Sequence, residues 1–488
     1  SSEAAVDETA RWAQSAAHVL RTRDRLFRAT LLEAMAESIE ASRDELIATA
    51  DAETGLGVPR LTGESGRSAF QFRLFAEAVR EGSFLEAAID HAGDTPLGSG
   101  PDVRRLLVSV GPVAVFGSSN FPFAFSVLGG DVASAIAAGS PVVVKAHGSH
   151  PLTSKLSFEV LQRAAESVGA PRGTFGIVYG QAAGVALVKH PAIKAAGFTG
   201  SLGAARALIA AIETRPEPIP FYGELSSINP LVVSPGAVAA RGAAIAEGLF
   251  TSFTGSAGQL CTKPGIAFVP SGAAGQGVVD ALVALTDAAG PQVLLNDRIR
   301  DSFGDISERL VEAGASEVAV GSASSSSSSS SSGFSVLPTL LEVSATALDA
   351  DLAEECFGPL IVVARYDSLD EVRAAFGRIP KSLTATLHVE DDETDVVSSL
   401  GSTLEESAGR VVFNGYPTGV RVTWAQQHGG PWPSTNSQHT SVGVTAVRRF
   451  LRPVAWQNAP AAALPPELRD DYTSIPRRID GTLTLPTP

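Results

Sequence analysis

Between about residue 110 and residue 226, the chain alternates short β-rich runs with helical stretches, and this alternation limits the possible folds more than any other feature. The β-rich runs include GPVAVFG, SPVVVKA, GTFGIVYG and IKAAGFTG, and the stretches between them repeat apolar residues every three or four positions. Two parallel strands need a crossover that returns the chain to the end of the sheet where the first strand began, and a helix of this length provides it. The pattern therefore predicts an α/β fold with a doubly wound parallel sheet, covered by helices on both faces.

Two other regions flank this one. Residues 7 to 50 have helical periodicity, the segment ETGLGVPRLTGE predicts a break, and a second helical stretch is expected to reach about residue 90. From about residue 227 to residue 440, runs such as PGIAFVP, PLIVVARY and SLTATLHV alternate with helical segments again. Because 488 residues exceed what one core usually holds, we expect two or three domains, with a second parallel sheet in the later region.

The charge balance and the cysteine count limit the partners and the compartment. The chain has 37 basic and 52 acidic residues, and its net charge of −15 argues against nucleic acid or an anionic membrane surface as partner. No stretch approaches ~20 uninterrupted apolar residues, and the start, SSEAAVDETARWAQ, lacks the pattern of a signal peptide. Two widely separated cysteines make no disulfide framework, so we expect a cytoplasmic protein. The serine run Ser324 to Ser332 has the composition of a linker and supports no further inference.

One of the two cysteines, Cys261, lies in the glycine-rich segment TGSAGQLCTKPG. A packing cysteine usually sits in an apolar run, whereas a reactive one needs an open and polar setting. This contrast favours a reactive thiol but leaves a structural role open.

Two strand ends carry residues that suit a phosphate-bearing ligand. Lys145 ends the run VVVKA, where it is either a solvated strand end or a ribose and phosphate contact. Gly200 and Ser201 end another strand and start a helix, which suits an anion, although a serine there is more often a simple N-cap. The chain has no G-x-G-x-x-G segment and no Walker A loop, so the usual dinucleotide fingerprint is missing.

Two polar residues stand in apolar surroundings. Glu224 lies in PIPFYGELSSINP, where it is either a hydrogen-bonded glutamate or a general base. Asn120, in FGSSNFPFAFS, is either a turn residue or an amide donor to a developing oxyanion.

The histidines predict no metal site. His147 and His150 are three residues apart in a loop segment, and the chain has neither an H-E-x-x-H motif nor paired C-x-x-C motifs. His428 and His439 are interpreted as structural residues.

Taken in order, the motifs of this chain resemble those of the aldehyde dehydrogenase superfamily along nearly the whole sequence. They are GPVAVFGSSNFPFAFS, PVVVKAHGSHP, GFTGS, ELSSINP, GQLCTKPG, EECFGPL and FNGYPTGV. The segments PEPIPFYGELSSINP and HGGPWPSTNSQHTSVGVTAVRRFLRPVAWQN are similar to the NADP-preferring bacterial branch, which contains α-ketoglutarate semialdehyde dehydrogenases and a fatty-aldehyde dehydrogenase.

The resemblance implies three catalytic roles. Cys261 would attack the aldehyde carbon as a thiolate, and Glu224 would activate the water that hydrolyses the resulting thioester. The side-chain amide of Asn120 and the backbone N–H of Cys261 would hold the oxyanion.

The resemblance also implies binding residues. For the cofactor these are Lys145, Gly148, Gly200, Ser201, Glu355 and Phe357, and for the substrate they are Phe121 and Arg421. Gly148 stands where NAD-preferring members have a glutamate that would repel a 2′-phosphate, which favours NADP over NAD. Arg421 stands where a glutamate is expected, and it could bind a substrate carboxylate or lie on the surface. Cys356 is interpreted as a packing residue.

By the same resemblance, residues 1–91 and 110–226 would form a cofactor-binding domain and residues 227–440 a catalytic domain. Residues 92–109 and 453–488 would form an oligomerisation hairpin and a C-terminal tail, which implies a homodimer or a pair of dimers. The predicted function is NADP-dependent oxidation of a small aldehyde, a semialdehyde such as α-ketoglutarate semialdehyde, to the acid. The alternatives are a fatty or other aliphatic aldehyde dehydrogenase, a CoA-acylating dehydrogenase, and a silent NADP-binding protein.

Overall fold

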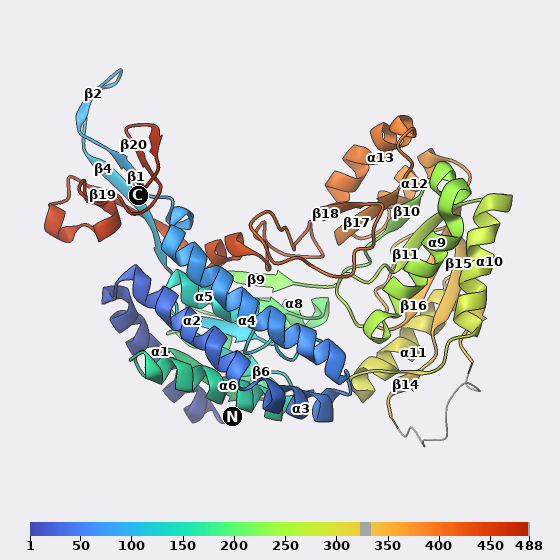
Figure 1. Cartoon of the computed structure of the whole chain (residues 1–488), viewed down its shortest axis with the longest axis horizontal. Coiled ribbons are helices and arrows are strands. Elements are labelled where there is room, and N and C mark those ends of the chain that lie inside the picture. Colours follow the sequence, from blue (N-terminus) through green and yellow to red (C-terminus); the bar gives the residue numbers. More distant parts are fainter. Residues whose placement is uncertain (323–332, 487–488) are drawn as a thin grey trace.

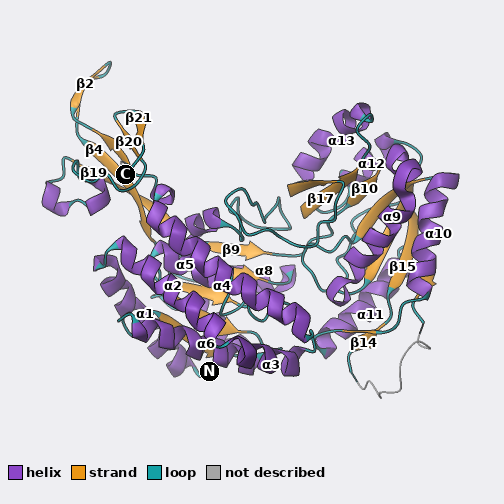
Figure 2. Ribbon diagram, viewed as in Figure 1, coloured by secondary structure: helices purple, strands orange, loops and turns teal. Residues whose placement is uncertain are grey.

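A computed structural model describes residues 1–322 and 333–486 of the chain (Figure 1). The run from Ser324 to Ser332 lies outside the described residues. Two sheets with surrounding helices form the bulk of the molecule, and a smaller sheet extends from one end (Figure 2).

Four helices open the chain: α1 (Glu3–Thr22), α2 (Arg25–Ala41), α3 (Arg43–Thr54) and α4 (Val58–Glu81). The expected break is shorter than the sequence suggested, because α4 already begins at Val58, with Pro59 in its first turn. Proline fits there, since the first helical N–H groups have no partner within the helix. The second helical stretch also ends earlier than expected, at Glu81, where Gly82 caps α4 with φ 77°.

The first large sheet is parallel throughout, with the order β7-β6-β5-β8-β9. Its strands are β5 (Val113–Phe116), β6 (Val142–Ala146), β7 (Phe175–Tyr179), β8 (Ala195–Thr199) and β9 (Phe221–Glu224). The connecting helices are α5 (Gly130–Ala138), α6 (Pro151–Ser167), α7 (Gln181–Lys189) and α8 (Leu202–Glu213). This confirms the doubly wound sheet predicted from the alternation. The strand order reverses between β5 and β8, and in doubly wound sheets ligands bind at the carboxyl ends of the strands beside such a reversal.

The second large sheet has seven strands in the order β13-β15-β16-β11-β10-β17-β18. They are β10 (Leu231–Val233), β11 (Ile266–Pro270), β13 (Ser316–Val320), β15 (Thr339–Ser344), β16 (Leu360–Tyr366), β17 (Ser382–His388) and β18 (Ala408–Phe413). All neighbours pair in parallel except β13, which is antiparallel to β15. The helices are α9 (Pro235–Thr254), α10 (Ala273–Asp287), α11 (Asp297–Glu312), α12 (Leu369–Phe376) and α13 (Thr394–Ser407).

The extending sheet has the order β19-β4-β1-β20-β21. It combines β1 (Ala88–Asp90) and β4 (Val103–Ser109) with strands from the end of the chain: β19 (Leu451–Gln457), β20 (Arg477–Ile479) and β21 (Thr482–Thr484). A hairpin of β2 (Gly93–Thr95) and β3 (Gly98–Gly100) lies at its tip (Figure 1). The division into cofactor-binding, catalytic and oligomerisation parts stays a prediction. In the described part of the chain, no helix has both the length and the apolar character needed to cross a bilayer.

Candidate active site

The carboxyl edge of the five-stranded sheet gathers several predicted residues. Lys145 is the second-last residue of β6, and Glu224 ends β9. Gly200 and Ser201 follow β8, and Ser201 caps α8 by accepting a hydrogen bond from the N–H of Ala204 at 3.4 Å. Because these strands are parallel neighbours, residues that are far apart in the sequence meet along one edge.

The loop after β5 carries Asn120, and its backbone is fixed by side chains from α4 and from the start of α6. Arg60 donates from Nη2 to the Asn120 carbonyl at 2.6 Å. The Glu64 carboxylate accepts from two successive N–H groups, those of Phe123 and Ala124, at 2.8 and 2.9 Å. His150, which we interpreted only as a non-metal histidine, contacts the Ser118 carbonyl through Nε2 at 2.8 Å. Four contacts therefore hold the backbone around Asn120.

The loop that carries Cys261 has a strained backbone. Ser256, Ala257 and Gly258 have positive φ angles of 54°, 54° and 67° in succession. A Cβ on Gly258 would lie 2.1 Å from the carbonyl oxygen of Gly358, so only glycine allows this approach. Left-handed backbone at non-glycine residues costs free energy and persists only where the surroundings enforce it.

Buried amides supply that support. Asn229, fully buried, donates from Nδ2 to the carbonyls of Cys261 and Lys263 at 2.9 and 3.0 Å. Asn120 donates from Nδ2 to the Gln259 carbonyl at 2.9 Å, which brings the predicted oxyanion donor to the cysteine loop. Sequence reasoning missed Asn229, although it stands in the quoted motif ELSSINP, five residues after Glu224.

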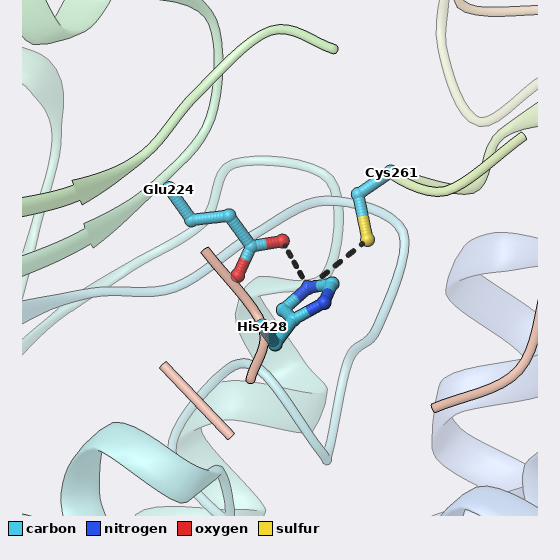
Figure 3. Close-up of side chains that lie close together, drawn as sticks. All are labelled: Glu224, Cys261 and His428. Atoms are coloured by element: carbon cyan, nitrogen blue, oxygen red, sulfur yellow. Dashed lines mark hydrogen bonds and ion pairs between the residues drawn. The ribbon is translucent and has the colours of Figure 1, made fainter. Parts of the chain in front are cut away.

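Cys261 and Glu224 meet on either side of a third residue, His428 (Figure 3). The Nε2 atom of His428 lies 2.8 Å from Oε1 of Glu224 and 3.6 Å from Sγ of Cys261. Ser441 donates its hydroxyl to the other carboxylate oxygen of Glu224 at 2.7 Å. His428 and Glu224 are only 1% and 3% exposed, so the contact between them is shielded from bulk water, whereas Cys261 is half-buried.

The charges at this site favour an ionised carboxylate and a neutral thiol. Burial opposes ionisation of Glu224, but the charge and hydrogen bond of His428 and the bond from Ser441 hold its pKa below the ordinary value. Burial, and then the negative charge of Glu224, raise the pKa of the Cys261 thiol well above its ordinary value. The thiol therefore needs a nearby base before it can act as a nucleophile.

The structure places His428 between the predicted nucleophile and the predicted base, where the sequence had suggested only a structural residue. Its segment, QQHGGPW, has no local pattern typical of a catalytic histidine. One donor atom from each of Glu224, Cys261 and His428 lies within 4.8 Å of the others, a set that could also hold a metal ion and that the sequence did not predict.

The second group of predicted cofactor residues lies beside the cysteine loop. Burial raises the pKa of Glu355 to about 7, although hydrogen bonds from the Ser226 hydroxyl and the Ser227 backbone act to lower it. The charge of Glu355 also raises the pKa of Cys261. Phe357 is half-buried in the same segment, which packs on the cysteine loop through Gly358. Cys356 is 1% exposed in an apolar core cluster, which confirms its packing role.

The two predicted substrate residues have different surroundings. Phe121 is half-buried and packs on the ring of Phe125, with ring centroids 5.2 Å apart, one residue beyond Asn120. Arg421 is exposed and has no hydrogen bond or ion pair within the described residues. The structure therefore brings Phe121 to the site but gives Arg421 no contact there.

The sheet edge at the strand-order reversal has open space beside two glycines, as a nicotinamide dinucleotide would need. No described atom lies within 4 Å of a Cβ built on Gly148 or Gly203, so space is open beside the ends of β6 and β8. Burial lowers the pKa of Lys145 at this edge, because it disfavours the charged ammonium group. Lys145, Gly148, Gly200 and Ser201 are the residues that would hold the phosphates and the adenosine ribose.

A family model confirms the class of protein that this fold and site suggest. The model described as "Aldehyde dehydrogenase family" matches residues 1–452, so the chain belongs to the aldehyde dehydrogenase family. It is an NAD(P)-dependent oxidoreductase that converts an aldehyde to the carboxylic acid.

Two curated relatives are similar over almost the whole chain. Alpha-ketoglutaric semialdehyde dehydrogenase 2 of Azospirillum brasilense is 44% identical over 489 residues, covering 98% of this chain and 92% of the relative. Alpha-ketoglutaric semialdehyde dehydrogenase of Acinetobacter baylyi is 41% identical over 465 residues, covering 94% and 87%.

Solved structures support the fold. One is 3,6-anhydro-L-galactose dehydrogenase in complex with NAP, with TM-score 0.80 and 20% identity, covering 93% of this chain and 91% of that one. Another is PnpE in complex with nicotinamide adenine dinucleotide, with TM-score 0.80 and 23% identity, covering 96% and 92%.

Proposed function

We propose that this enzyme oxidises a short aldehyde bearing a carboxylate, such as α-ketoglutaric semialdehyde, and that NADP is its preferred cofactor. The observation that carries the chemistry is the contact of His428 with both Cys261 and Glu224. The names of the relatives at 44% and 41% identity support the substrate class.

The first step that the geometry supports is activation of the thiol. Nε2 of His428 lies 3.6 Å from the Cys261 thiol, and it can take the thiol proton in the tautomer that carries its hydrogen on Nδ1, because an Nε2–H donating to the ionised Glu224 has no lone pair left. Once protonated, Nε2 donates to the adjacent Glu224, which stabilises the imidazolium. The thiolate then attacks the aldehyde carbon and forms a thiohemiacetal. Asn120 has a second amide hydrogen beyond the one given to the Gln259 carbonyl, and with the Cys261 N–H it would stabilise the oxyanion.

A nicotinamide dinucleotide held by Lys145, Gly148, Gly200 and Ser201 would supply the hydride acceptor for this oxidation, and the acyl group would then remain on Cys261 as a thioester. Glu224 is ionised and buried, so it is suited to take a proton from the water that attacks this thioester. Glu224 would first have to give up its hydrogen bond to His428 and form one to the water. A CoA-acylating enzyme has no need of such a base, so Glu224 favours hydrolysis.

The preference for NADP rests on Gly148, which presents no carboxylate to a 2′-phosphate and leaves open space beside the end of β6. We also propose a homo-oligomer, a dimer or a pair of dimers, supported by the extending sheet with its hairpin of β2 and β3. Two unpaired cysteines support a cytoplasmic location.

The test is reduction of NADP and of NAD, followed at 340 nm, with α-ketoglutaric semialdehyde, succinic semialdehyde and a medium-chain aliphatic aldehyde. We expect the highest kcat/KM with a semialdehyde and NADP. A higher kcat/KM for the aliphatic aldehyde would refute the substrate class, and a higher value with NAD would refute the cofactor preference. His428→Ala tests the role of His428 separately: the rate at which iodoacetamide alkylates Cys261 should fall, and unchanged alkylation would refute the role as base.

A further inference from the structure

Helix α4 presents three charged residues toward the loop that carries Asn120. Arg60, Glu64 and Arg67 are spaced by four and three residues, which puts them on one face of the helix. Arg60 and Glu64 have structural tasks: Arg60 holds the Asn120 carbonyl, Glu64 holds two N–H groups of the same loop, and their charged groups lie 4.0 Å apart.

Arg67 differs from these neighbours because its guanidinium has no hydrogen-bond or ion-pair partner. Within the described residues its guanidinium makes no hydrogen bond and no ion pair. Two of its nitrogens, Nε and Nη2, are buried without a hydrogen-bond partner. Buried N–H groups of a cation are unfavourable when nothing accepts their hydrogen bonds, and water, an ion or a ligand normally satisfies them.

The surroundings of Arg67 place it beside the reacting groups. Its guanidinium carbon lies 5.2 Å from the ring centroid of Phe125 and 5.9 Å from that of Phe121. The Phe125 ring in turn lies 6.2 Å from the His428 ring. The charge of Arg67 also acts on Cys261, Glu64 and Glu224. Nη1 is not among the buried nitrogens, so it is the part of the guanidinium open to a ligand.

Within the described residues no acidic side chain forms an ion pair with this cation, and the Glu64 carboxylate, whose charge acts on it, pairs with Arg60 instead. Glu224 lies nearby, but its two oxygens are bonded to His428 and Ser441. The Cys261 thiol, with its raised pKa, is neutral at rest. An anionic group on the ligand would therefore complete the charge balance, and a planar guanidinium matches a carboxylate in shape and charge.

We propose that Arg67 binds the carboxylate of the substrate and thereby makes the enzyme selective for aldehydes that carry one. This inference rests on the proposed function, since it assigns a residue to that substrate class. It also replaces Arg421, the arginine suggested by the sequence, because Arg421 is exposed and has no contact with the site.

The test compares Arg67→Met with the unchanged enzyme on two aldehydes of equal length, succinic semialdehyde and butanal. Methionine keeps much of the apolar length but removes the charge. We expect the ratio of kcat/KM for succinic semialdehyde to that for butanal to fall about 10- to 100-fold, mainly through KM for the semialdehyde. Arg67→Lys should give an intermediate ratio, because it keeps the charge without the planar group.

Other outcomes would overturn the inference in distinguishable ways. An equal loss with both aldehydes in Arg67→Met would mean that Arg67 acts on the thiol, which leaves the proposed function intact. A fall in the ratio with Arg421→Met but not with Arg67→Met would assign the carboxylate to Arg421. If the unchanged enzyme itself prefers butanal, the proposed substrate class fails, and this inference fails with it.

A measurement on the unchanged enzyme covers the case in which Arg67→Met does not fold. Glutarate, a dicarboxylate without an aldehyde, should slow alkylation of Cys261 by iodoacetamide, as measured by mass spectrometry of the peptide. The neutral diamide glutaramide should not slow it. Equal effects of the two compounds would contradict a carboxylate site near the thiol.

Discussion

The two sides of the active site are built in different ways. At the carboxyl edge of the five-stranded sheet, Lys145, Ser201 and Glu224 each stand at the end of a regular strand or the start of a helix. Opposite them, Cys261 stands on a loop with three successive left-handed residues, whose shape depends on Asn229 and on close contact with Gly358.

Because of this difference, we expect substitutions on the two sides of the site to affect folding differently. Groups at strand ends are positioned by hydrogen bonds that the sheet makes anyway, so their side chains can change with little effect on folding. A loop held by long-range contacts stores strain, so substitutions there affect stability and activity together. The predictions below test this contrast, starting with the largest expected effect.

The largest effects on activity are expected at Cys261 in the loop and at Glu224 at the strand end, and the two should differ in kind. Cys261→Ala should abolish cofactor reduction, by at least about 10⁴-fold, because no nucleophile remains. Glu224→Gln should lower steady-state turnover by about 10²- to 10⁴-fold but preserve a first burst, because the thioester forms and hydrolyses slowly. Rapid mixing at 340 nm measures both. Absence of a burst in Glu224→Gln, from protein that still binds NADP, would mean that Glu224 acts before the thioester.

The same substitution should have opposite effects in the loop and in a regular helix. Gly258→Ala should destabilise the protein by about 3 kcal/mol and slow Cys261 alkylation, because its Cβ would lie 2.1 Å from the Gly358 carbonyl oxygen. Gly277→Ala in α10 has open space around it and should stabilise the protein by about 0.5 to 1 kcal/mol. Thermal midpoints of unfolding measure both effects. An unchanged midpoint for Gly258→Ala would show that the close contact with Gly358 does not hold the conformation of this loop.

A pH-dependent effect is expected where the two sides meet, at Glu355. Burial raises its pKa from the ordinary 4.5 to about 7, so between these values the folded protein holds a proton that the unfolded chain has lost. The stability of the unchanged protein should fall as the pH rises from 4.5 to 7, by up to about 3 kcal/mol.

Glu355→Gln removes this titration. The variant should match the unchanged protein near pH 5 and be more stable at pH 8, as read from thermal midpoints in the two buffers. A variant that is equally or less stable at pH 8 would mean that Glu355 is ionised at little cost in the folded state.

The smallest effect is expected at the sheet edge. Gly148→Glu should lower the ratio of kcat/KM for NADP to that for NAD by about 10- to 100-fold, because the carboxylate would repel the 2′-phosphate. Gly148→Ala is the control for size without charge, and the thermal midpoints of both variants should stay close to that of the unchanged protein. An unaltered ratio in Gly148→Glu would show that Gly148 does not determine the cofactor preference.

Much of the fold follows from local patterns in the sequence. The β-rich runs at 113–116, 142–146, 175–179 and 195–199 are strands of the parallel sheet, as predicted. The start of α4 was misplaced, because proline and glycine near a helix start look like a break when read from the sequence. The ordered motifs identified the family, and with it Cys261, Glu224 and Asn120, whose proposed roles the experiments above test.

By itself, the sequence determined the alternating elements, the family and the residue types that could react, because each of these is a property of neighbours along the chain. Only the tertiary structure decided that His428, 167 residues from Cys261 and 204 from Glu224, contacts both of them. It also decided that the Arg67 guanidinium packs over Phe121 and Phe125 without a hydrogen bond or an ion pair. Contacts over such separations depend on how sheets and loops pack against one another, and no local pattern encodes that packing.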